Sequence, residues 1–156
     1  MTNPPNLLTR SLTLWFTRSS RAAWAPILVF AIHVVLAKVF DVYTHFPNID
    51  IPMHFFGGVA ITYFLLRSAT VAVDLNFLGS PNRAAVALLT FLAASTTTIF
   101  WEFAEWIFDH SFQRQFQAGL NDTMLDMFLG ILGSIIYLAL NPALSRRSSN
   151  STINGR

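Results

Sequence analysis

The sequence predicts an all-α, polytopic membrane protein in which about four transmembrane helices form a compact bundle. Of its 156 residues, 53% are hydrophobic and only 12% are charged, and the mean hydropathy is +0.49. These values are too apolar for a water-soluble domain of this length. The apolar residues also gather into four runs, each near the ~20 residues with which a helix crosses the hydrocarbon core. Because the runs mostly lack the polar face of a soluble helix, they argue against a soluble bundle.

The four runs occupy residues 24–44, 53–73, 84–108 and 123–141. Pro47 and Pro52 bound the first connection, residues 79–82 (Gly-Ser-Pro-Asn) predict a turn in the second, and Pro142 follows the last run. The first run is longer than the core of a signal peptide and has no small-residue cleavage site after it. We therefore expect it to remain in the mature protein.

The segments that flank these runs divide the chain into three parts. Residues 1–23 form an N-terminal segment on the cytoplasmic side or in the interface, 24–141 the transmembrane domain, and 142–156 a polar cytoplasmic tail predicted to be disordered. Within the first part, residues 6–21 mix Leu, Trp and Phe with three Arg, which is typical of an amphipathic helix in the headgroup region. An ordered tail without a role fits this segment equally well.

The basic residues predict the orientation. They flank the chain ends and the second connection: Arg10, Arg18, Arg21, Arg67, Arg83, Arg146, Arg147 and Arg156. With four crossings these regions share one side, which the positive-inside rule makes cytoplasmic. We expect a bacterial inner-membrane protein with both termini in the cytoplasm. The bilayer is its expected partner, and nucleic acid is not, because the net charge is only +2 and no basic tract is present.

The acidic residues gather at the opposite, outward end of the predicted bundle. Seven of the eight fall there: Asp41, Asp50, Glu102, Glu105, Asp109, Asp122 and Asp126. His45, His54 and His110 are placed at the same end. The positive-inside rule says little about acids, so their position is a separate observation.

Helical spacing predicts that part of this set meets in one pocket. Ser95, Thr98, Glu102, Glu105 and Asp109 step by three and four residues and so share one stripe of the third run. On the fourth run a stripe of Asp122, Asp126, Gly130, Gly133 and Tyr137 contains small residues that allow close helix contact. The second run opens with His54, followed by Gly57 and Gly58. We expect these four glycines to bring the helices together.

Several carboxylates in a partly desolvated pocket repel one another, and a cation, bound protons or basic side chains must offset the repulsion. A divalent metal is one hypothesis, with His54, Glu102, Glu105 and Asp126 as ligands. The chain has no cysteine, so oxygen and imidazole ligands favour Mg, Mn, Fe or Zn over Ca. A structural network, in which Lys38 and Arg114 neutralise the acids, and a proton or cation pathway stay open as alternatives.

Other polar and aromatic residues are expected to play lesser parts. Asp41 and His45 end the first run and are expected to be solvated, with a ligand role as the alternative. His33, in the middle of that run, is expected to be neutral and hydrogen-bonded to another helix. Four aromatic side chains at the outer level predict an interfacial belt: Trp101, Trp106, Phe108 and Phe112.

The motifs also support a resemblance. His54-Phe55 before Gly57-Gly58, Trp101-Glu102-x-x-Glu105-x-x-x-Asp109, and Asp122-Thr123-x-x-Asp126 with Gly130 together resemble the YjdF-like bacterial inner-membrane proteins, and more weakly the VanZ-like group. The resemblance covers about residues 41–134. It implies a multi-helix inner-membrane protein of a family without an established biochemical role. It therefore supports the site and implies no reaction. Relatives can have more spans than the four predicted here.

Three functions follow as hypotheses. The first is a metal-dependent hydrolase or transferase that acts on a lipid or envelope precursor, with Asp109 or Asp122 as general base or in support of the ligands. No serine–histidine nucleophile motif or basic phosphate-binding signature accompanies these residues. The second is a cation-binding or transport module, and the third is a structural membrane subunit without catalysis.

Overall fold

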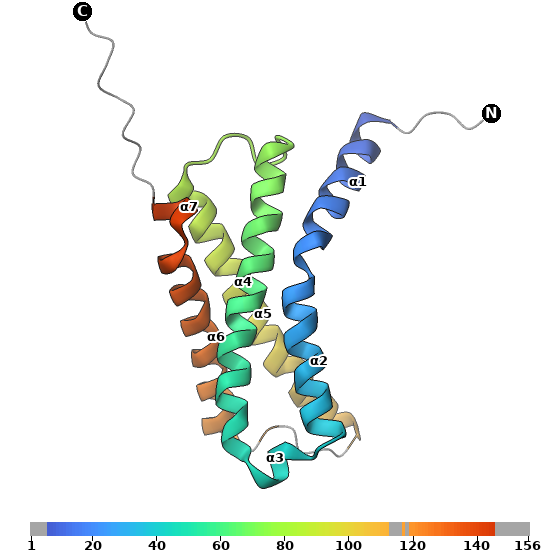
Figure 1. Ribbon diagram of the computed structural model, residues 1–156, viewed down its shortest axis with the longest axis vertical. Coiled ribbons are helices and arrows are strands. Elements are labelled where there is room, and N and C mark those ends of the chain that lie inside the picture. Colours follow the sequence, from blue (N-terminus) through green and yellow to red (C-terminus); the bar gives the residue numbers. More distant parts are fainter. Residues whose placement is uncertain (1–5, 113–116, 118, 146–156) are drawn as a thin grey trace, which may run out of the picture.

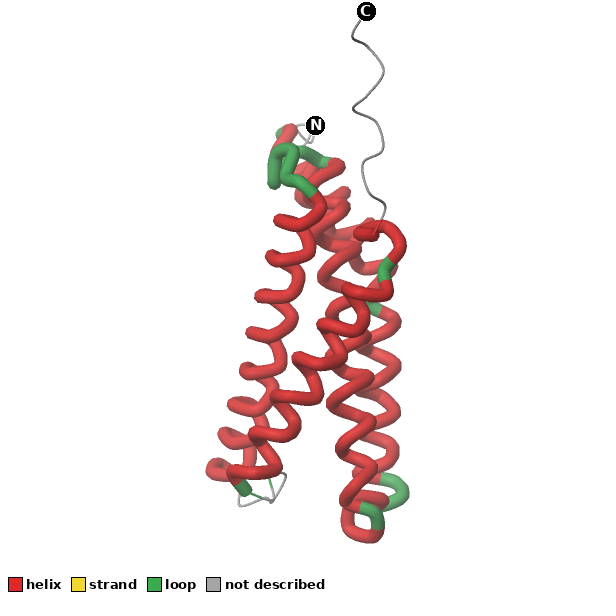
Figure 2. Tube along the Cα trace, turned by 90° about the vertical axis from the view of Figure 1, so that its left-hand side faces the viewer, coloured by secondary structure: helices red, strands yellow, loops and turns green. Residues whose placement is uncertain are grey.

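In the computed structural model, the described residues 6–112, 117 and 119–145 are arranged as helices and short connections (Figure 2). The order is α1 (Leu7–Ser19), η1 (Ser20–Ala22), α2 (Trp24–Lys38), α3 (Val42–His45), η2 (Pro47–Ile49), α4 (Asp50–Asp74), α5 (Arg83–Phe112), α6 (Leu120–Leu140) and α7 (Pro142–Ser145). No strand occurs among these residues. The prediction of an all-α polytopic membrane protein is confirmed.

Three helices, α4, α5 and α6, are long and apolar enough to cross a membrane. The segments 7–22 and 24–37 pass the same test only as a pair, bent by 49° at the break between them, so the chain has three candidate crossings, or four if the bent pair is one. Figure 1 places the start of α1, the turn between α4 and α5, and α7 at one end, with α3 at the other. The bundle thus agrees with the prediction of about four crossings.

The prediction of one continuous helix over residues 24–44 is wrong. Helix α2 ends at Lys38, and α3 begins only at Val42. Between them the Phe40 N–H donates to the Val35 carbonyl oxygen at 3.3 Å, and Asp41 adopts a left-handed conformation with φ 48°. Such a wide turn with a left-handed residue ends a helix, and Asp tolerates this conformation better than most residues. At 15 residues α2 is about 22 Å long, too short to cross alone.

Helix α1 confirms that residues 6–21 contain a helix. The Asn6 side chain caps its start, accepting from the Thr9 N–H at 2.7 Å. The Trp15 indole N–H donates to the Ser68 carbonyl oxygen at 3.1 Å and so fastens α1 to α4. Of the segment 142–156, for which the sequence predicts disorder, Pro142–Ser145 form α7 and the rest lies outside the described residues.

The closest helix pair is α4 with α6, and missing side chains create this contact. A Cβ on Gly58 would overlap the Gly130 backbone, and one on Gly133 would overlap the Phe55 carbonyl oxygen. Between the helices the hydroxyls of Thr62 and Ser134 lie 2.7 Å apart, and both side chains are fully buried. Small residues and interhelical hydrogen bonds hold membrane helices together in this way.

Gly57 departs from the prediction that all four glycines bring helices together. Its missing Cβ has no neighbour within 4 Å, so it approaches no other helix closely. The helical repeat places it about 100° around α4 from Gly58, and it therefore borders open space beside the α4–α6 contact.

The bundle buries small side chains and exposes large apolar ones. Ala60 and Ala94 are buried, whereas Leu92, Ile107 and Phe128 are each more than half exposed. A protein in water would reverse this arrangement, because large apolar side chains would leave the solvent. The exposed apolar surface is suited to contact with lipid.

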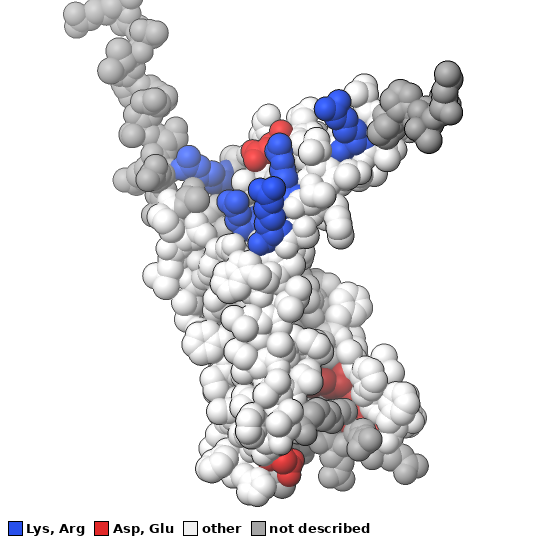
Figure 3. Space-filling model, turned by 45° about the vertical axis from the view of Figure 1, so that its right-hand side comes forward, with Lys and Arg blue, Asp and Glu red and all other residues white. Residues whose placement is uncertain are grey.

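Charges of opposite sign separate along the bundle (Figure 3). The described Arg residues belong to α1, η1, the second half of α4 and the start of α5, and the blue surface gathers at that end. Red surface appears mainly at the opposite end. Asp74, the last residue of α4, is the acid predicted for the Arg-rich end.

Candidate functional site

His54, in the first turns of α4, lies at the centre of a cluster of carboxylates. Its Nε2 is 3.3 Å from Asp50 Oδ1 and 3.8 Å from Asp126 Oδ1, and its Nδ1 is 3.6 Å from Glu102 Oε1. The His54 side chain is only 8% exposed. One imidazole therefore joins acids from three helices, with Asp50 one turn away on its own helix.

Glu102 is one of two buried acids in this cluster. Its side chain is 3% exposed and that of Asp126 5%. The Glu102 Oε1 has no hydrogen-bond partner among the residues that the structure describes. Its other oxygen, Oε2, accepts from the Gln117 side-chain amide at 3.3 Å, and the same amide donates to the Glu102 carbonyl oxygen at 3.1 Å. A buried carboxylate oxygen without a partner is costly, so it marks a place where a ligand would stabilise the protein.

Glu105 completes the α5 side of the cluster. The Trp101 indole N–H donates to Glu105 Oε1 at 3.0 Å, one turn away on the same helix. The Trp101 ring also makes edge contacts with two rings on α2. Its centroid lies 5.7 Å from that of Phe30 and 6.2 Å from that of His33. Trp101 is thus part of the site, whereas the sequence predicts only an interfacial belt for it.

Two groups of three side chains have the spacing of a metal site. His54, Glu102 and Glu105 form one, and Asp50, His54 and Asp126 the other; within each, one potential ligand atom per residue lies within 4.8 Å of the others. Two ligands about 2.1 Å from one ion at a tetrahedral angle lie about 3.4 Å apart. The 3.6 Å from His54 Nδ1 to Glu102 Oε1 is close to this value and long for a hydrogen bond.

The predicted ligands His54, Glu102, Glu105 and Asp126 are therefore brought together, although in two overlapping groups. Asp109 lies further along α5, where its Oδ2 accepts from the Gln117 backbone N–H at 2.9 Å. Asp122 begins α6 one turn before Asp126 and belongs to neither group. The inward stripes predicted on the third and fourth runs are confirmed, since all their members are buried or half-buried.

Two residues of the site lie outside the predicted ligand set. Asp50 has a sequence signal, because it precedes His54 by one helical turn. Gln117 has none, since it lies between α5 and α6, where no periodicity places a side chain. The predicted neutralising groups, Arg114 and the Lys38 side chain, lie outside the described residues and side chains.

The histidines and acids around the site differ in burial. Asp41 and His45 are exposed and belong to neither group of potential ligands, consistent with a solvated position. His33 Nδ1 lies 2.7 Å from the Tyr43 hydroxyl on α3. Tyr43 belongs to the same predicted run, 24–44, as His33, so this contact is not the predicted hydrogen bond to another span. Burial, with a smaller effect of Asp50, raises the pKa of the Tyr43 phenol above its ordinary value.

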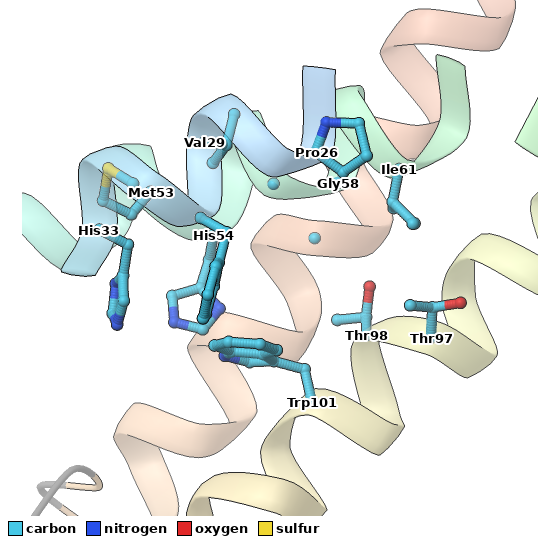
Figure 4. A pocket seen from close by; sticks show the side chains of 13 residues that line it. Pro26, Val29, His33, Met53, His54, Gly58, Ile61, Thr97, Thr98 and Trp101 are labelled. Carbon is cyan, nitrogen blue, oxygen red and sulfur yellow. The ribbon is translucent and has the colours of Figure 1, made fainter. Parts of the chain in front are cut away.

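Two cavities adjoin the cluster. One, of about 260 Å³, lies among α2, α4 and α5 and is mostly apolar, with His54 on its wall (Figure 4). The other, of about 760 Å³, lies between α5 and α6 and is lined in part by Glu102, Asp109 and Gln117. His54 therefore lines the first cavity and Glu102 the second, which is also mostly apolar but carries the Glu102 and Asp109 carboxylates and the His110 imidazole.

The fold and this cluster define a polytopic helical membrane protein with a buried carboxylate–histidine site. The chain belongs to the family described as predicted membrane protein (DUF2238), which matches residues 5–147. An uncharacterized protein of Thermotoga maritima is 31% identical over 103 residues, which are 65% of this chain and 52% of that protein. This chain thus spans about half the length of that relative. No solved structure matches. The YjdF-like name is not confirmed by these comparisons, and the weaker VanZ-like resemblance has no support in them.

Proposed function

We propose that this protein is a membrane hydrolase or transferase in which His54, Glu102 and Glu105 bind a divalent cation. The observation that carries the proposal is the buried Glu102 Oε1, which has no hydrogen-bond partner among the described residues and faces His54 Nδ1 at 3.6 Å. A cation between these two atoms would satisfy the oxygen and offset its charge.

The balance of charge favours a cation. The cluster contains four carboxylates, and among the described residues His54 is the base within ion-pair distance of three of them, Asp50, Glu102 and Asp126. A single imidazole offsets at most one negative charge. A divalent cation would offset two of the four negative charges, more than the imidazole can, and such compensation is usual where acids converge at low dielectric.

The two nitrogens of His54 have different tasks in this proposal. With Nδ1 on the cation, the Nε2–H would donate to Asp50, 3.3 Å away, and this contact would hold the ring and its tautomer. Asp126 Oδ1 lies 3.8 Å from the same Nε2. It would either hold the imidazole ring in place or act as a further ligand of the cation. Gln117 and Trp101 orient the two glutamates.

The cation, taken from Mg, Mn, Fe or Zn, would activate water or polarise a phosphoryl or carbonyl group of a lipid or envelope precursor. Asp109 is the preferred general base, because it lines the 760 Å³ cavity together with Glu102. Asp122 remains the other candidate. The separation of charge along the bundle supports an inner-membrane orientation with the Arg-rich end in the cytoplasm and the cluster facing outward.

Metal analysis of the detergent-purified full chain tests the proposal. We expect about one divalent ion per chain in the wild type and less than about a tenth of that in Glu102→Gln, since loss of one charged ligand weakens such sites by orders of magnitude. Asp74→Asn, an acid-to-amide change at the other end of α4, is the matched control and should retain the ion. A wild type that binds no divalent ion in an added-metal titration would refute the proposal.

A structural network is the second candidate, and one observation favours it. His54 lies between Asp50 and Asp126, so a protonated imidazole would offset part of their charge without a metal. In that case Glu102→Gln would remove an uncompensated buried charge and raise the thermal stability of the metal-free protein. In the metal-site case, the same variant would lose the stabilisation that added metal gives the wild type.

A further inference from the structure

The apolar cavity extends from the level of the cluster toward the middle of the bundle. On α4 its wall runs from Met53 to Ile61, a rise of about 12 Å, and Val29 and Phe30 of α2 face it from the other side. Figure 4 shows His33 and Met53 at one end of this space, His54 and Trp101 nearer its middle, and Ile61 toward the other end. A lipid chain runs in the same direction, from the interface toward the middle of the bilayer.

The cavity opens to the surface between α2 and α5. Helix α2 packs against α4 and meets α5 through the ring contacts of Phe30 and His33 with Trp101. Two of the residues on the cavity wall reach the surface of the bundle, Phe30 with 51% and Trp101 with 37% of their area exposed. Because α5 is a candidate membrane crossing and α2 forms part of another, this opening faces hydrocarbon.

Resting on the proposed function, we infer that this cavity binds an acyl chain of a membrane phospholipid with an amine in its head group, and that this class of lipid is the substrate. An apolar cavity of ~150 Å³ accepts a benzene ring, so a volume of 260 Å³ holds a section of acyl chain. The chain enters between α2 and α5 and places the head group at the His54–Glu102 contact.

The charge of the second cavity selects the head group. Among the mostly apolar side chains that line the 760 Å³ space, the charged groups are the carboxylates of Glu102 and Asp109, with the His110 imidazole beside them. Two carboxylates against one imidazole favour a head group that ends in a cationic amine over one that is only anionic. Phosphatidylethanolamine has this chemistry. Its phosphate ester lies between chain and amine, at the level where the proposed cation polarises a phosphoryl group.

Photo-crosslinking tests the inference in nanodiscs that contain the full chain. The probes are phosphatidylethanolamine and phosphatidylglycerol with the same diazirine in one acyl chain. We expect the phosphatidylethanolamine probe to label residues 26–33, 53–61 and 97–101 more strongly than the phosphatidylglycerol probe does. Labelling concentrated on other lipid-facing residues, or equal labelling by both probes, would overturn the inference.

Substitutions that fill the apolar cavity with a larger side chain provide variants and a matched control for the labelling experiment. Gly57→Leu introduces a side chain where the missing Cβ has no neighbour within 4 Å, and it should reduce labelling of the cavity by about fivefold or more. Val29→Phe fills the same space from α2 and should have the same effect. Ala93→Leu adds the same bulk as Gly57→Leu at an exposed position of α5 and should leave labelling unchanged. Unchanged labelling in both filled variants would also overturn the inference.

The metal content separates this inference from the proposed function. Gly57→Leu should retain the divalent ion, because its side chain lies in the apolar cavity and is not a proposed ligand. Metal binding in a protein whose cavity is not labelled would overturn the lipid inference alone. Labelling of the cavity in a wild type that binds no metal would overturn the proposed function and the substrate role that rests on it.

Discussion

The contact between α4 and α6 predicts that alanine substitutions at the adjacent glycines Gly57 and Gly58 differ in their effect on stability. A Cβ on Gly58 would lie 2.8 Å from the Gly130 Cα and closer still to its carbonyl oxygen, whereas ordinary contacts begin at 3.4 Å. Because the obstacle is backbone, it cannot rotate away. Gly58→Ala should therefore separate the two helices by at least 0.6 Å, the difference between these distances.

The cost follows from what this separation breaks. Overpacking of a close contact costs about 1–3 kcal/mol, and the buried Thr62–Ser134 hydrogen bond adds about 0.6–1.7 kcal/mol on the scale of membrane helices. Gly57→Ala meets no neighbour, and both variants gain the same helix propensity from alanine. We expect Gly58→Ala to be about 2–4 kcal/mol less stable than Gly57→Ala.

Reversible unfolding of both variants in mild detergent with increasing dodecyl sulfate measures this difference. Metal content is a second readout, because His54 lies one turn before Gly58 and moves with α4. We expect Gly58→Ala to lose affinity for the ion and Gly57→Ala to keep it. Free energies of unfolding that agree within about 0.5 kcal/mol would refute the close approach of α4 and α6.

Three further predictions concern the site and its orientation. Gln117→Ala removes the amide that holds Glu102 and should weaken metal binding about 10- to 100-fold in a competition titration; unchanged affinity would exclude this role. Asp50→Asn keeps the shape but removes the charge beside His54 Nε2, so we expect a loss in the same range, smaller than that of Glu102→Gln. The chain has no native cysteine, so an impermeant maleimide should label Asn48→Cys in intact cells and Leu78→Cys only after permeabilisation, and the reverse would invert the topology.

Most of the helical framework follows from composition and spacing. The runs 53–73, 84–108 and 123–141 correspond to α4, α5 and α6. These helices can be predicted from the sequence because lipid offers no hydrogen bonds to the backbone, and a long apolar segment in a bilayer therefore becomes helical. The break after Lys38 could not be predicted in this way, since Val39 and Phe40 continue the apolar run and no Gly or Pro stands between Lys38 and Val42. Backbone conformation at Asp41 decides it.

The sequence by itself determined that acids gather at one end of an α-helical membrane bundle, and which of them share a helix face, because helical periodicity is a local property. Only the tertiary structure decided that His54 lies close to Asp50, Glu102 and Asp126. It also decided that the Gln117 side-chain amide donates a hydrogen bond to Glu102, and that Gly57 borders a cavity. Those facts depend on how far apart the helices lie and how they are rotated. Packing of small residues such as Gly58 against Gly130 sets that distance, and no pattern within one helix encodes it.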